Sequence, residues 1–261
     1  MSARRSALGA RLVPLPLPLY ALCVLCVSGC GVTPLTNKIR PGEEPFVVVV
    51  GEGSDGFTDL FAAPAGGGTF HQLTFNRLVE QSPRLSPAGR SLAFIRRRDS
   101  LDADAELVVL DLATTSETTA RLPTGSRPER LGWSVDGAMI YLAGARMLAV
   151  PVPLRSVGSP SHDADSAVAD SLTRPLLGDP VFAEVRVCSE GGWCVIAGGR
   201  ATPLGSDVSD PLRWGTDSVA YIRQGSIEIR PLGGGRARRP VWTRPPANIR
   251  QPTHHPGAAA R

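Results

Sequence analysis

The first place where residue types and spacing could support chemistry is a serine between two glycines. Residues Gly132 to Gly137 spell GWSVDG. A nucleophilic serine on a strand-to-helix elbow needs a glycine two residues after it, but Asp136 occupies that position. An apolar strand-like run follows Gly137. The segment therefore predicts a hairpin turn, and Ser134 is not expected to be catalytic.

Acidic residues and histidines do not form a metal-binding pattern. The stretch from Asp102 to Glu106 alternates carboxylates, but it lacks the glycine and the distal glutamate of a calcium loop. The four histidines are scattered along the chain: His71, His162, His254 and His255. His71 is expected to be structural, and the last two could hold a metal only adventitiously. Without a phosphate loop or a dinucleotide fingerprint, the sequence predicts no metal and no cofactor.

Cys188 and Cys194 flank a predicted turn between paired strands. With residues 189 to 193 as the loop, the two would lie opposite each other, at about 4.5 to 5.5 Å between Cβ atoms. That distance is slightly wider than a disulfide needs, so some adjustment is expected. An oxidising compartment favours the bond. The sequence predicts a disulfide, with two buried free thiols as the alternative.

Residues 1–29 have the composition of a targeting segment. The run from Leu12 to Val27 is apolar and ends in Val-Ser-Gly-Cys at Cys30, and a basic start precedes it: Arg4, Arg5 and Arg11. This ending resembles the lipobox of bacterial lipoproteins, which implies cleavage before Cys30 and lipidation of its sulfur. Several acyl chains on one cysteine would anchor the protein stably. An ordinary secretory signal and a short membrane anchor are the alternatives, and the prolines in the run disfavour a spanning helix.

The residue after the candidate lipidated cysteine is Gly31. An aspartate there usually signals inner-membrane retention, so its absence favours the outer membrane, facing the periplasm. Residues 30–45 are polar and interrupted by proline and glycine, which predicts a tether.

Composition argues against a nucleic-acid partner. The 261-residue chain has a formal charge of +4, and the leader holds three arginines and no acid, so the mature charge falls to +1. Lys38 is the only lysine, and the arginine runs at 96–98 and 236–239 are short. Nucleic-acid binding needs a clustered basic face, which this pattern does not indicate.

A repeated hairpin organises the remainder of the chain. Ser86, Ser134 and Ser189 are each followed three residues later by glycine and then by an apolar strand. The intervals between them are 48 and 55 residues, close to the period of propeller blades. A weaker copy begins at Arg213. The repeats predict an all-β fold, a β-propeller of about five blades.

The repeat also resembles a known family. Ser-Pro-Asp-Gly-Lys before an apolar strand, with a Gln-Leu-Thr segment upstream, is typical of the WD-repeat-like blades of TolB and its relatives. The corresponding segments here are His71–Phe75, Pro83–Ile95 and Glu106–Leu112. The resemblance covers residues 46–242, although Ala88 replaces the usual aspartate and Val135 the usual proline. It implies a TolB-like propeller and says little about activity.

Strand patterns place five blades in residues 46–242, with the first and fourth incomplete. The third is expected to end with Leu172–Leu176, after a long polar loop over 155–171, and the fifth with Arg238–Trp242. Residues 243–261 are rich in Pro, Arg and Ala and predict a disordered tail. No strand is then left after Trp242 to complete the first blade.

These patterns predict an envelope lipoprotein whose propeller is a non-catalytic protein-interaction module. The resemblance to TolB implies protein contacts at the periplasmic side of the outer membrane, with an envelope protein partner that the sequence does not identify. A glycan- or small-molecule-binding propeller is the alternative. Four tryptophans lie at strand positions, where packing of the blades is expected and a sugar platform would need exposed rings: Trp133, Trp193, Trp214 and Trp242. An enzyme is disfavoured, since peptidases that resemble this blade pattern carry an α/β-hydrolase domain for which no room follows Trp242.

Overall fold

The computed structural model describes part of the chain: residues 35, 38–52, 55, 57–99, 104–144, 147–154, 162–163, 185–188, 191–197, 199–215 and 217–257. None of these residues is helical, so the predicted all-β class is confirmed for them. Among them, no helix has the length and apolarity that a bilayer crossing requires. The predicted leader, the lipobox with Cys30, and Leu172–Leu176 lie outside the described residues.

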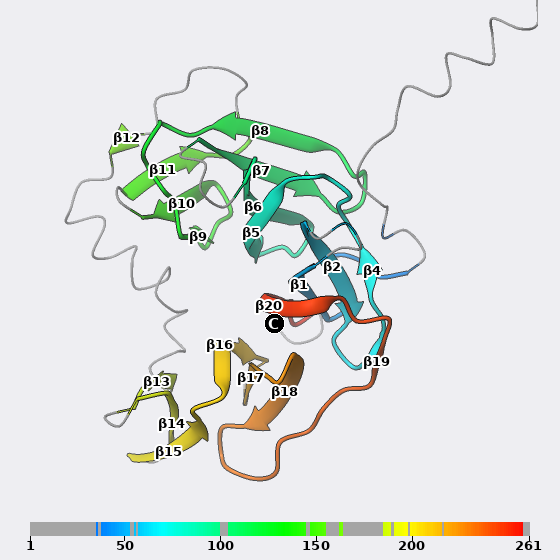
Figure 1. Cartoon of the computed structure of the whole chain (residues 1–261), viewed down its shortest axis with the longest axis vertical. Helices are drawn as coiled ribbons and strands as arrows, with labels where there is room; N and C mark the ends of the chain where they lie inside the picture. Colours follow the sequence, from blue (N-terminus) through cyan, green and yellow to red (C-terminus); the bar gives the residue numbers. More distant parts are fainter. Residues whose placement is uncertain are drawn as a thin grey trace, which may run out of the picture. The chain divides into compact units, whose positions relative to one another are not determined.

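The described strands group into five antiparallel blades and one two-stranded ladder (Figure 1), and a single parallel bridge, Thr58↔Val79, links blades 1 and 2 into one continuous sheet. Blade 1 comprises β20 (Ala247–His255), β1 (Phe46–Glu52), β2 (Thr58–Pro64) and β4 (His71–Gln72). Blade 2 comprises β5 (Val79–Leu85), β6 (Ser91–Arg97), β7 (Ala105–Asp111) and β8 (Glu117–Arg121). Blade 3 comprises β9 (Arg130–Trp133), β10 (Met139–Ala143), β11 (Met147–Pro151) and β12 (His162–Asp163).

Two further blades and the small ladder complete the described strands. Blade 4 comprises β13 (Val185–Val187), β14 (Trp193–Ala197) and β15 (Arg200–Gly205). Blade 5 comprises β16 (Val208–Trp214), β17 (Ser218–Arg223) and β18 (Ser226–Pro231). The ladder pairs β3 (Gly68–Thr69) in parallel with β19 (Trp242–Thr243). The described strands confirm the predicted count of five blades, and blades 4 and 5 each have three described strands.

Alternation of side chains along single strands explains how the blades stack. In β1, Phe46, Val48 and Val50 pack into a cluster with blade 2, whereas Val47 and Val49 pack into a second cluster with blade 5. Successive residues of a strand point to opposite faces, so a blade between two neighbours needs apolar residues at every position. This requirement explains the uninterrupted run FVVVV, of which no residue is more than 1% exposed.

The same alternation recurs in blades 2 and 5. In β6, Leu92 and Phe94 join the cluster shared with blade 1, and their neighbours join a cluster shared with blade 3. In β17, Val219 and Tyr221 join a cluster with blade 4, while Ala220 and Ile222 face blade 1. The described blades therefore stack in the order 3, 2, 1, 5, 4, through four apolar interfaces. Face-to-face stacking of antiparallel blades is the packing of a β-propeller.

The predicted disordered tail over 243–261 is wrong for most of its length. Residues 247–255 form β20, which pairs with β1 in antiparallel register from Phe46↔His255 to Glu52↔Ala247. Figure 1 shows this last strand, in red, beside β1 in blue. Blade 1 is thus completed by the C-terminal segment, which protects an edge that would otherwise be open. The prediction that no strand follows Trp242 is wrong for the same reason.

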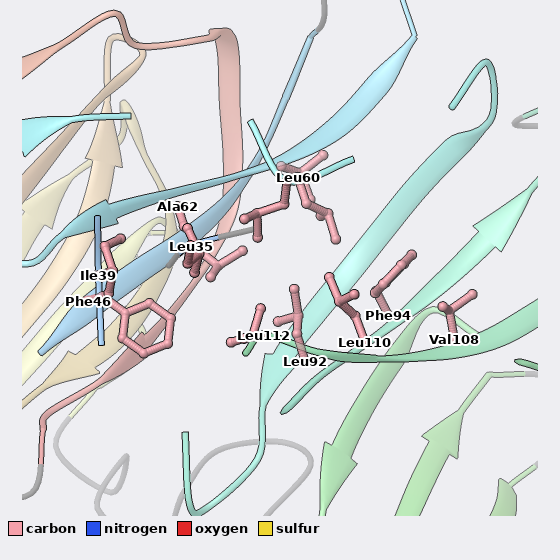
Figure 2. Packing of buried hydrophobic residues seen from close by; sticks show 13 residues of the cluster. Leu35, Ile39, Phe46, Leu60, Ala62, Leu92, Phe94, Val108, Leu110 and Leu112 are labelled. Carbon is pink, nitrogen blue, oxygen red and sulfur yellow. The ribbon is translucent and has the colours of Figure 1, made fainter. Parts of the chain in front are cut away.

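The predicted tether over 30–45 is also too long. Leu35 and Ile39 are 1% and 2% exposed, and both belong to the cluster between blades 1 and 2. Figure 2 shows them beside Phe46 and Ala62. In the sequence these two apolar residues stand among polar ones and form no strand pattern. The domain therefore begins about ten residues earlier than the strand pattern predicts.

Two blade ends also differ from the prediction. The fourth strand of blade 3 is β12, within the segment expected to be a loop, and its backbone pairs with Leu148 and Ala149. In blade 5, the expected strand Arg238–Trp242 is absent: Arg238 forms a single bridge with Ile229, and Trp242 belongs to β19. Both differences concern outer strands, whose short polar patterns carry little signal.

Candidate binding site on the inner strands

Four strands are the first of their blades, and neighbours among them are in contact: β16 with β20, β20 with β5, and β5 with β9. We call β20, β5, β9 and β16 the inner strands. Three of them contain the same irregularity, a residue with positive φ directly before a proline: Ser82 (54°), Asp210 (48°) and Gln251 (47°). At each of these steps the pairing register shifts against the next strand. Arg127, with φ of 39°, precedes Pro128 just before β9.

The proline step bends the inner strand and releases polar groups from the ladder. Proline has no N–H to donate, and a β-bulge leaves one residue unpaired and redirects its side chain. Positive φ is costly for any residue except glycine, so the surrounding structure must hold it in place. The repeated Xaa-Pro step therefore marks a place where the inner strands turn their polar groups toward each other.

Hydrogen bonds across the inner strands hold these bulges. The Ser82 N–H donates to Gln251 Oε1 at 2.7 Å, and the Ser82 hydroxyl donates to the carbonyl oxygen of Glu129 at 2.6 Å. The Leu85 N–H donates to Thr253 Oγ1 at 3.3 Å. Strand β5 is thereby tied to β20 on one side and to the segment entering β9 on the other. The C-terminal strand is an integral part of this arrangement.

Arg84 is the centre of charge on the inner strands. Its carbonyl oxygen accepts a bond from Trp133 Nε1 at 3.0 Å, and its Nη1 donates to the carbonyl oxygen of Pro83 at 3.0 Å. The side chain is half-buried. Burial lowers the pKa of Arg84, the carboxylate of Asp210 on β16 opposes this, and Arg130 on β9 lowers the pKa further.

Two charges from other blades, one on Arg130 of β9 and one on Asp210 of β16, thus act on Arg84 of β5. A half-buried arginine presents a rigid fork of donors that matches a carboxylate or phosphate, and partial burial strengthens such a contact. We call Arg84, Arg130 and Asp210 the Arg84 site. Its excess positive charge suits an anionic group on a ligand.

A second cluster of ionisable side chains is closed to solvent. The Glu80 side chain is 0% exposed and accepts bonds from Arg96 Nε at 3.0 Å and Nη2 at 2.9 Å. Arg96 also forms a bidentate pair with Glu117, at 2.8 Å for each bond. Thr74 Oγ1 donates to Glu80, and the Leu60 N–H donates to Thr74 Oγ1 at 2.9 Å.

Burial dominates the ionisation of this cluster. It raises the pKa of Glu80 to about 7, against the opposing charge and hydrogen bonds of Arg96 and Thr74. It also raises the pKa of Asp59 to about 6, an effect that Asp55 reinforces. Raised carboxyl pKa values are typical of general acids, but a side chain without solvent exposure cannot reach a substrate. The Glu80 cluster is therefore a structural clamp that connects β2, β5, β6 and β8.

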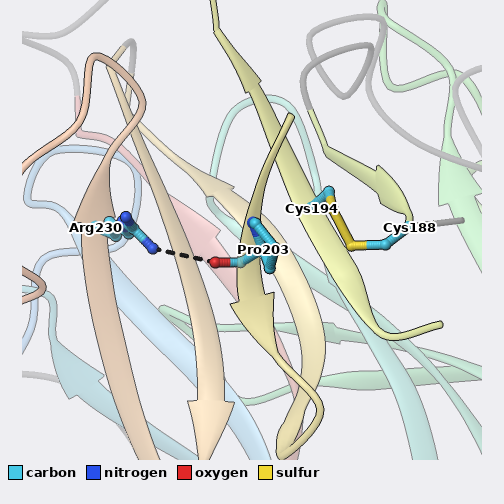
Figure 3. Close-up of a disulfide and its surroundings, with 4 residues drawn as sticks. All are labelled: Cys188, Cys194, Pro203 and Arg230. Atoms are coloured by element: carbon cyan, nitrogen blue, oxygen red, sulfur yellow. Dashed lines mark hydrogen bonds between the residues drawn. A yellow bond between two sulfur atoms is a disulfide. The ribbon is translucent and has the colours of Figure 1, made fainter. Parts of the chain in front are cut away.

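The candidate disulfide residues are joined in the structure. Cys188 and Cys194 form a disulfide with a Cα–Cα distance of 5.3 Å, at the end of blade 4 (Figure 3). The predicted bond is confirmed, but the expected register is wrong, because Cys194 pairs with Arg186 rather than with Cys188. Two residues along a strand return to the same face, so the two cysteines are diagonal neighbours.

Removing the disulfide is expected to loosen blade 4 alone. The bond closes a small loop, with a sequence separation of 6, for which chain entropy gives a stabilisation of about 2 kcal/mol. The double substitution Cys188→Ser/Cys194→Ser should speed amide hydrogen exchange in β13 and β14 and leave β1 and β6 protected. Equal loss of protection in β1 would show that blade 4 supports the whole stack.

The other residues considered from sequence have structural roles. The Met139 N–H donates to Ser134 Oγ at 2.9 Å and the Ala138 N–H donates to Asp136 Oδ1 at 3.0 Å, so the serine hairpin is confirmed as a turn. His254 stacks on Trp214 with ring centroids 4.1 Å apart, and burial lowers its pKa to about 4. His255 is buried beside Phe46. In the part of the chain that the structure describes, no three metal-ligating side chains gather.

The four tryptophans pack against the apolar clusters between the blades. Trp214 is 7% exposed, and the other three are partly buried. Trp133 and Trp242 use their Nε1 donors on backbone carbonyl oxygens, at 3.0 Å each. Trp193 packs against the cluster between blades 4 and 5. Their role in the described structure is the packing of blades.

Five antiparallel blades, four shared apolar interfaces and the pairing of the last strand with the first define an all-β protein of the β-propeller class. No protein-family model matches the chain, and no curated protein sequence matches it. Among solved structures, the chain is similar to TolB from Acinetobacter baumannii, with 12% identity and a TM-score of 0.40 over 81% of this chain and 66% of that one. A putative TolB from Agrobacterium tumefaciens gives 18% identity and a TM-score of 0.35, over 74% and 60%.

A third similar structure is the β-propeller domain of the Trilobed protease from Pyrococcus furiosus, described as having an open velcro topology. It gives 10% identity and a TM-score of 0.37, over 76% of this chain and 83% of that domain. The chain spans less than two thirds of the length of the two TolB chains. Because all three TM-scores are below 0.5, the assignment of the fold rests on the sheets and their interfaces.

Proposed function

We propose that the protein is a lipid-anchored component of the bacterial cell envelope whose propeller binds a protein partner without catalysing a reaction. The observation that carries the proposal is the Arg84 site on contacting inner strands of neighbouring blades, where the charges of Asp210 and Arg130 act on the half-buried Arg84. An acidic side chain or chain terminus of a partner would complete the charge balance there. Cys30 would carry the lipid, and the outer membrane, facing the periplasm, is the proposed location.

A rigid inner surface suits binding between preformed partners. The bulged inner strands are held by hydrogen bonds of 2.6 and 2.7 Å at Ser82, so little conformational entropy is lost when a ligand contacts them. Charge pairs that become desolvated on binding contribute strongly when one side is already partly buried, as Arg84 is.

Substitution of the arginine is expected to abolish partner capture. In cross-linked pull-downs from the native envelope, Arg84→Met should reduce recovery of a stoichiometric protein by at least tenfold, since removing one member of a desolvated charge pair costs about 2 kcal/mol or more. Arg200→Met removes an exposed arginine of blade 4 and should recover the partner as the wild type does.

The same capture experiment separates the proposal from its alternatives. The partner should elute with an unaltered mass, whereas a chemically changed partner would indicate catalysis. Cys30→Ala should release the protein from membranes in high salt. Equal recovery with Arg84→Met and wild type would show that the binding surface lies elsewhere, and a bound glycan without any protein would reject a protein-interaction module.

A further inference from the structure

The segment that leads into blade 1 carries a lysine on the protein surface. Leu35 and Ile39 are buried in the core between blades 1 and 2. The N–H groups of Lys38 and Ile39 donate to the carbonyl oxygen of Leu35 at 2.8 and 3.1 Å, which closes a turn. Lys38 itself is exposed. The two buried neighbours therefore fix the position at which this ammonium group leaves the surface.

Two further basic side chains, those of His71 and Arg244, belong to the same part of the molecule. His71 lies in β4, where it pairs with Ala62 of β2. The Phe70 N–H donates to the carbonyl oxygen of Thr243 at 3.0 Å, next to the ladder of β3 and β19. His71 follows Phe70 in the sequence, and Arg244 follows Thr243. Arg244 is exposed and His71 half-buried.

Two positive charges act on the imidazole of His71. Burial lowers the pKa of His71, and the two charges that lower it further are those of Lys38 and Arg244. We call these three residues the Lys38 site. Like charges repel when they are held together, so such a grouping is expected where an anion compensates for the cost.

We propose that the Lys38 site binds the phosphate of anionic phospholipid headgroups and holds blade 1 against the membrane surface. The inference rests on the proposed lipidation of Cys30. Seven residues separate Cys30 from Lys38, and a chain spans at most about 3.5 Å per residue. Lys38 would then remain within about 28 Å of the bilayer surface, whatever path those residues take.

The two cationic groups of the site fit the phosphate diester of a lipid headgroup. The guanidinium of Arg244 can form two parallel bonds to phosphate oxygens, and the ammonium of Lys38 adds a compact charge. A lipid anchor raises the effective concentration of headgroups at the site, so even a weak contact would fix the orientation of the propeller.

The test uses the mature chain with Cys30→Ser, which cannot be lipidated, in flotation assays at low salt. Vesicles of pure phosphatidylcholine are compared with vesicles containing phosphatidylglycerol. The protein should float only with the anionic vesicles, and each of Lys38→Gln and Arg244→Gln should weaken partitioning about fivefold, the value of one basic residue near such a surface. Arg200→Gln/Arg236→Gln removes two exposed arginines elsewhere and should partition as the parent does.

Several results would overturn the proposal. Equal weakening by the control pair would show unspecific attraction by net charge, and flotation with neutral vesicles would show an apolar contact. The NMR titration of His71 should shift to higher pH with anionic vesicles; an equal shift with inorganic phosphate at the same phosphate concentration would mean a site for free phosphate. Absence of flotation rejects the Lys38 site but leaves lipidation of Cys30 open, which the mass of the N-terminal peptide decides separately.

Discussion

A chain that ends at Thr243 is expected to lose cooperative folding. It lacks β20, which pairs with β1 along Phe46–Glu52 and buries Ile249, Thr253 and His255. Without β20 the inner edge of β1 is open and Ser82 loses its bond to Gln251. Loss of one strand from the centre of the stack removes several buried side chains and ladder bonds, about 5 kcal/mol or more, which matches the whole stability of many domains.

The effect is measured by urea denaturation followed through tryptophan fluorescence, since Trp214 stacks on His254 of β20. The matched control ends at Gly257 and retains all of β20. The control should unfold in one sharp transition at the midpoint of the full chain, whereas the chain ending at Thr243 should show none. An unchanged midpoint for the shorter chain would mean that β20 is dispensable.

Arg96→Met should be the most damaging single substitution in blade 2. It leaves the Glu80 carboxyl, whose side chain is 0% exposed, without the cation that donates two bonds to it. Breaking a buried pair by removing one partner costs about 3 kcal/mol or more, because the remaining charge is not compensated. Glu117→Gln alters the more exposed carboxylate, 21% exposed, and should cost less than about 1 kcal/mol.

The cost of Arg96→Met should depend on pH in a defined direction. The folded pKa of Glu80, about 7, is above its ordinary value of 4.5. Its contribution to stability is therefore fully present below about pH 4.5 and is lost as the pH rises through about 7. Removing Arg96 takes away a charge that lowers this pKa, so the deficit should be small at pH 5 and large at pH 8.

Denaturation midpoints at pH 5 and pH 8 test the Arg96→Met prediction. Glu80→Gln in the Arg96→Met background removes the ionisable group and should recover most of the loss at pH 8. The guanidinium carbon of Arg96 lies 5.1 Å from the centroid of the Phe94 ring. A deficit that is equal at both pH values, or that Glu80→Gln does not reduce, would mean that the loss comes from this packing contact.

The parts of the fold that depend on local pattern could be predicted from the sequence. The hairpins at Ser86 and Ser134 combine a turn with positive-φ glycines, Gly89 and Gly137, and an apolar strand, so their signal is short-range. The run Phe46–Val50 signals burial on both faces by its composition alone. The disulfide followed from the same hairpin pattern, although its register did not, because the turn closes between Cys188 and Gly192, so that Trp193 pairs with Val187 and Cys194 with Arg186.

The segments that the sequence missed depend on long-range partners. Strand β20 contains polar and basic residues and a proline, and only its pairing with β1, two hundred residues away, makes it a strand. Leu35 and Ile39 are isolated apolar residues whose burial needs the core of blades 1 and 2. Composition alone therefore predicts a disordered tail, because it contains no information about the partner strand.

The sequence signal that could have located the candidate site is a repeated proline step, not a pattern of charged residues. Ser82-Pro83, Arg127-Pro128, Asp210-Pro211 and Gln251-Pro252 stand near the starts of strand-like segments, where a proline indicates an edge strand or a bulge. This signal repeats with the blades and includes the C-terminal segment. The convergence of Arg84, Arg130 and Asp210, by contrast, depends on which blades are neighbours, and no local pattern contains that information.

Both the stack of blades and the Arg84 site depend on the pairing of β20 with β1. Glu52 and Ala247 are direct partners in this pairing, and neither is buried. Cysteines placed at both positions should be joined rapidly and almost completely by a short thiol cross-linker, as read by peptide mass spectrometry. A control pair at Glu52 and Arg236 should remain largely unlinked. Equal, slow linking of the two pairs would contradict the pairing of β20 with β1, and with it the proposed site.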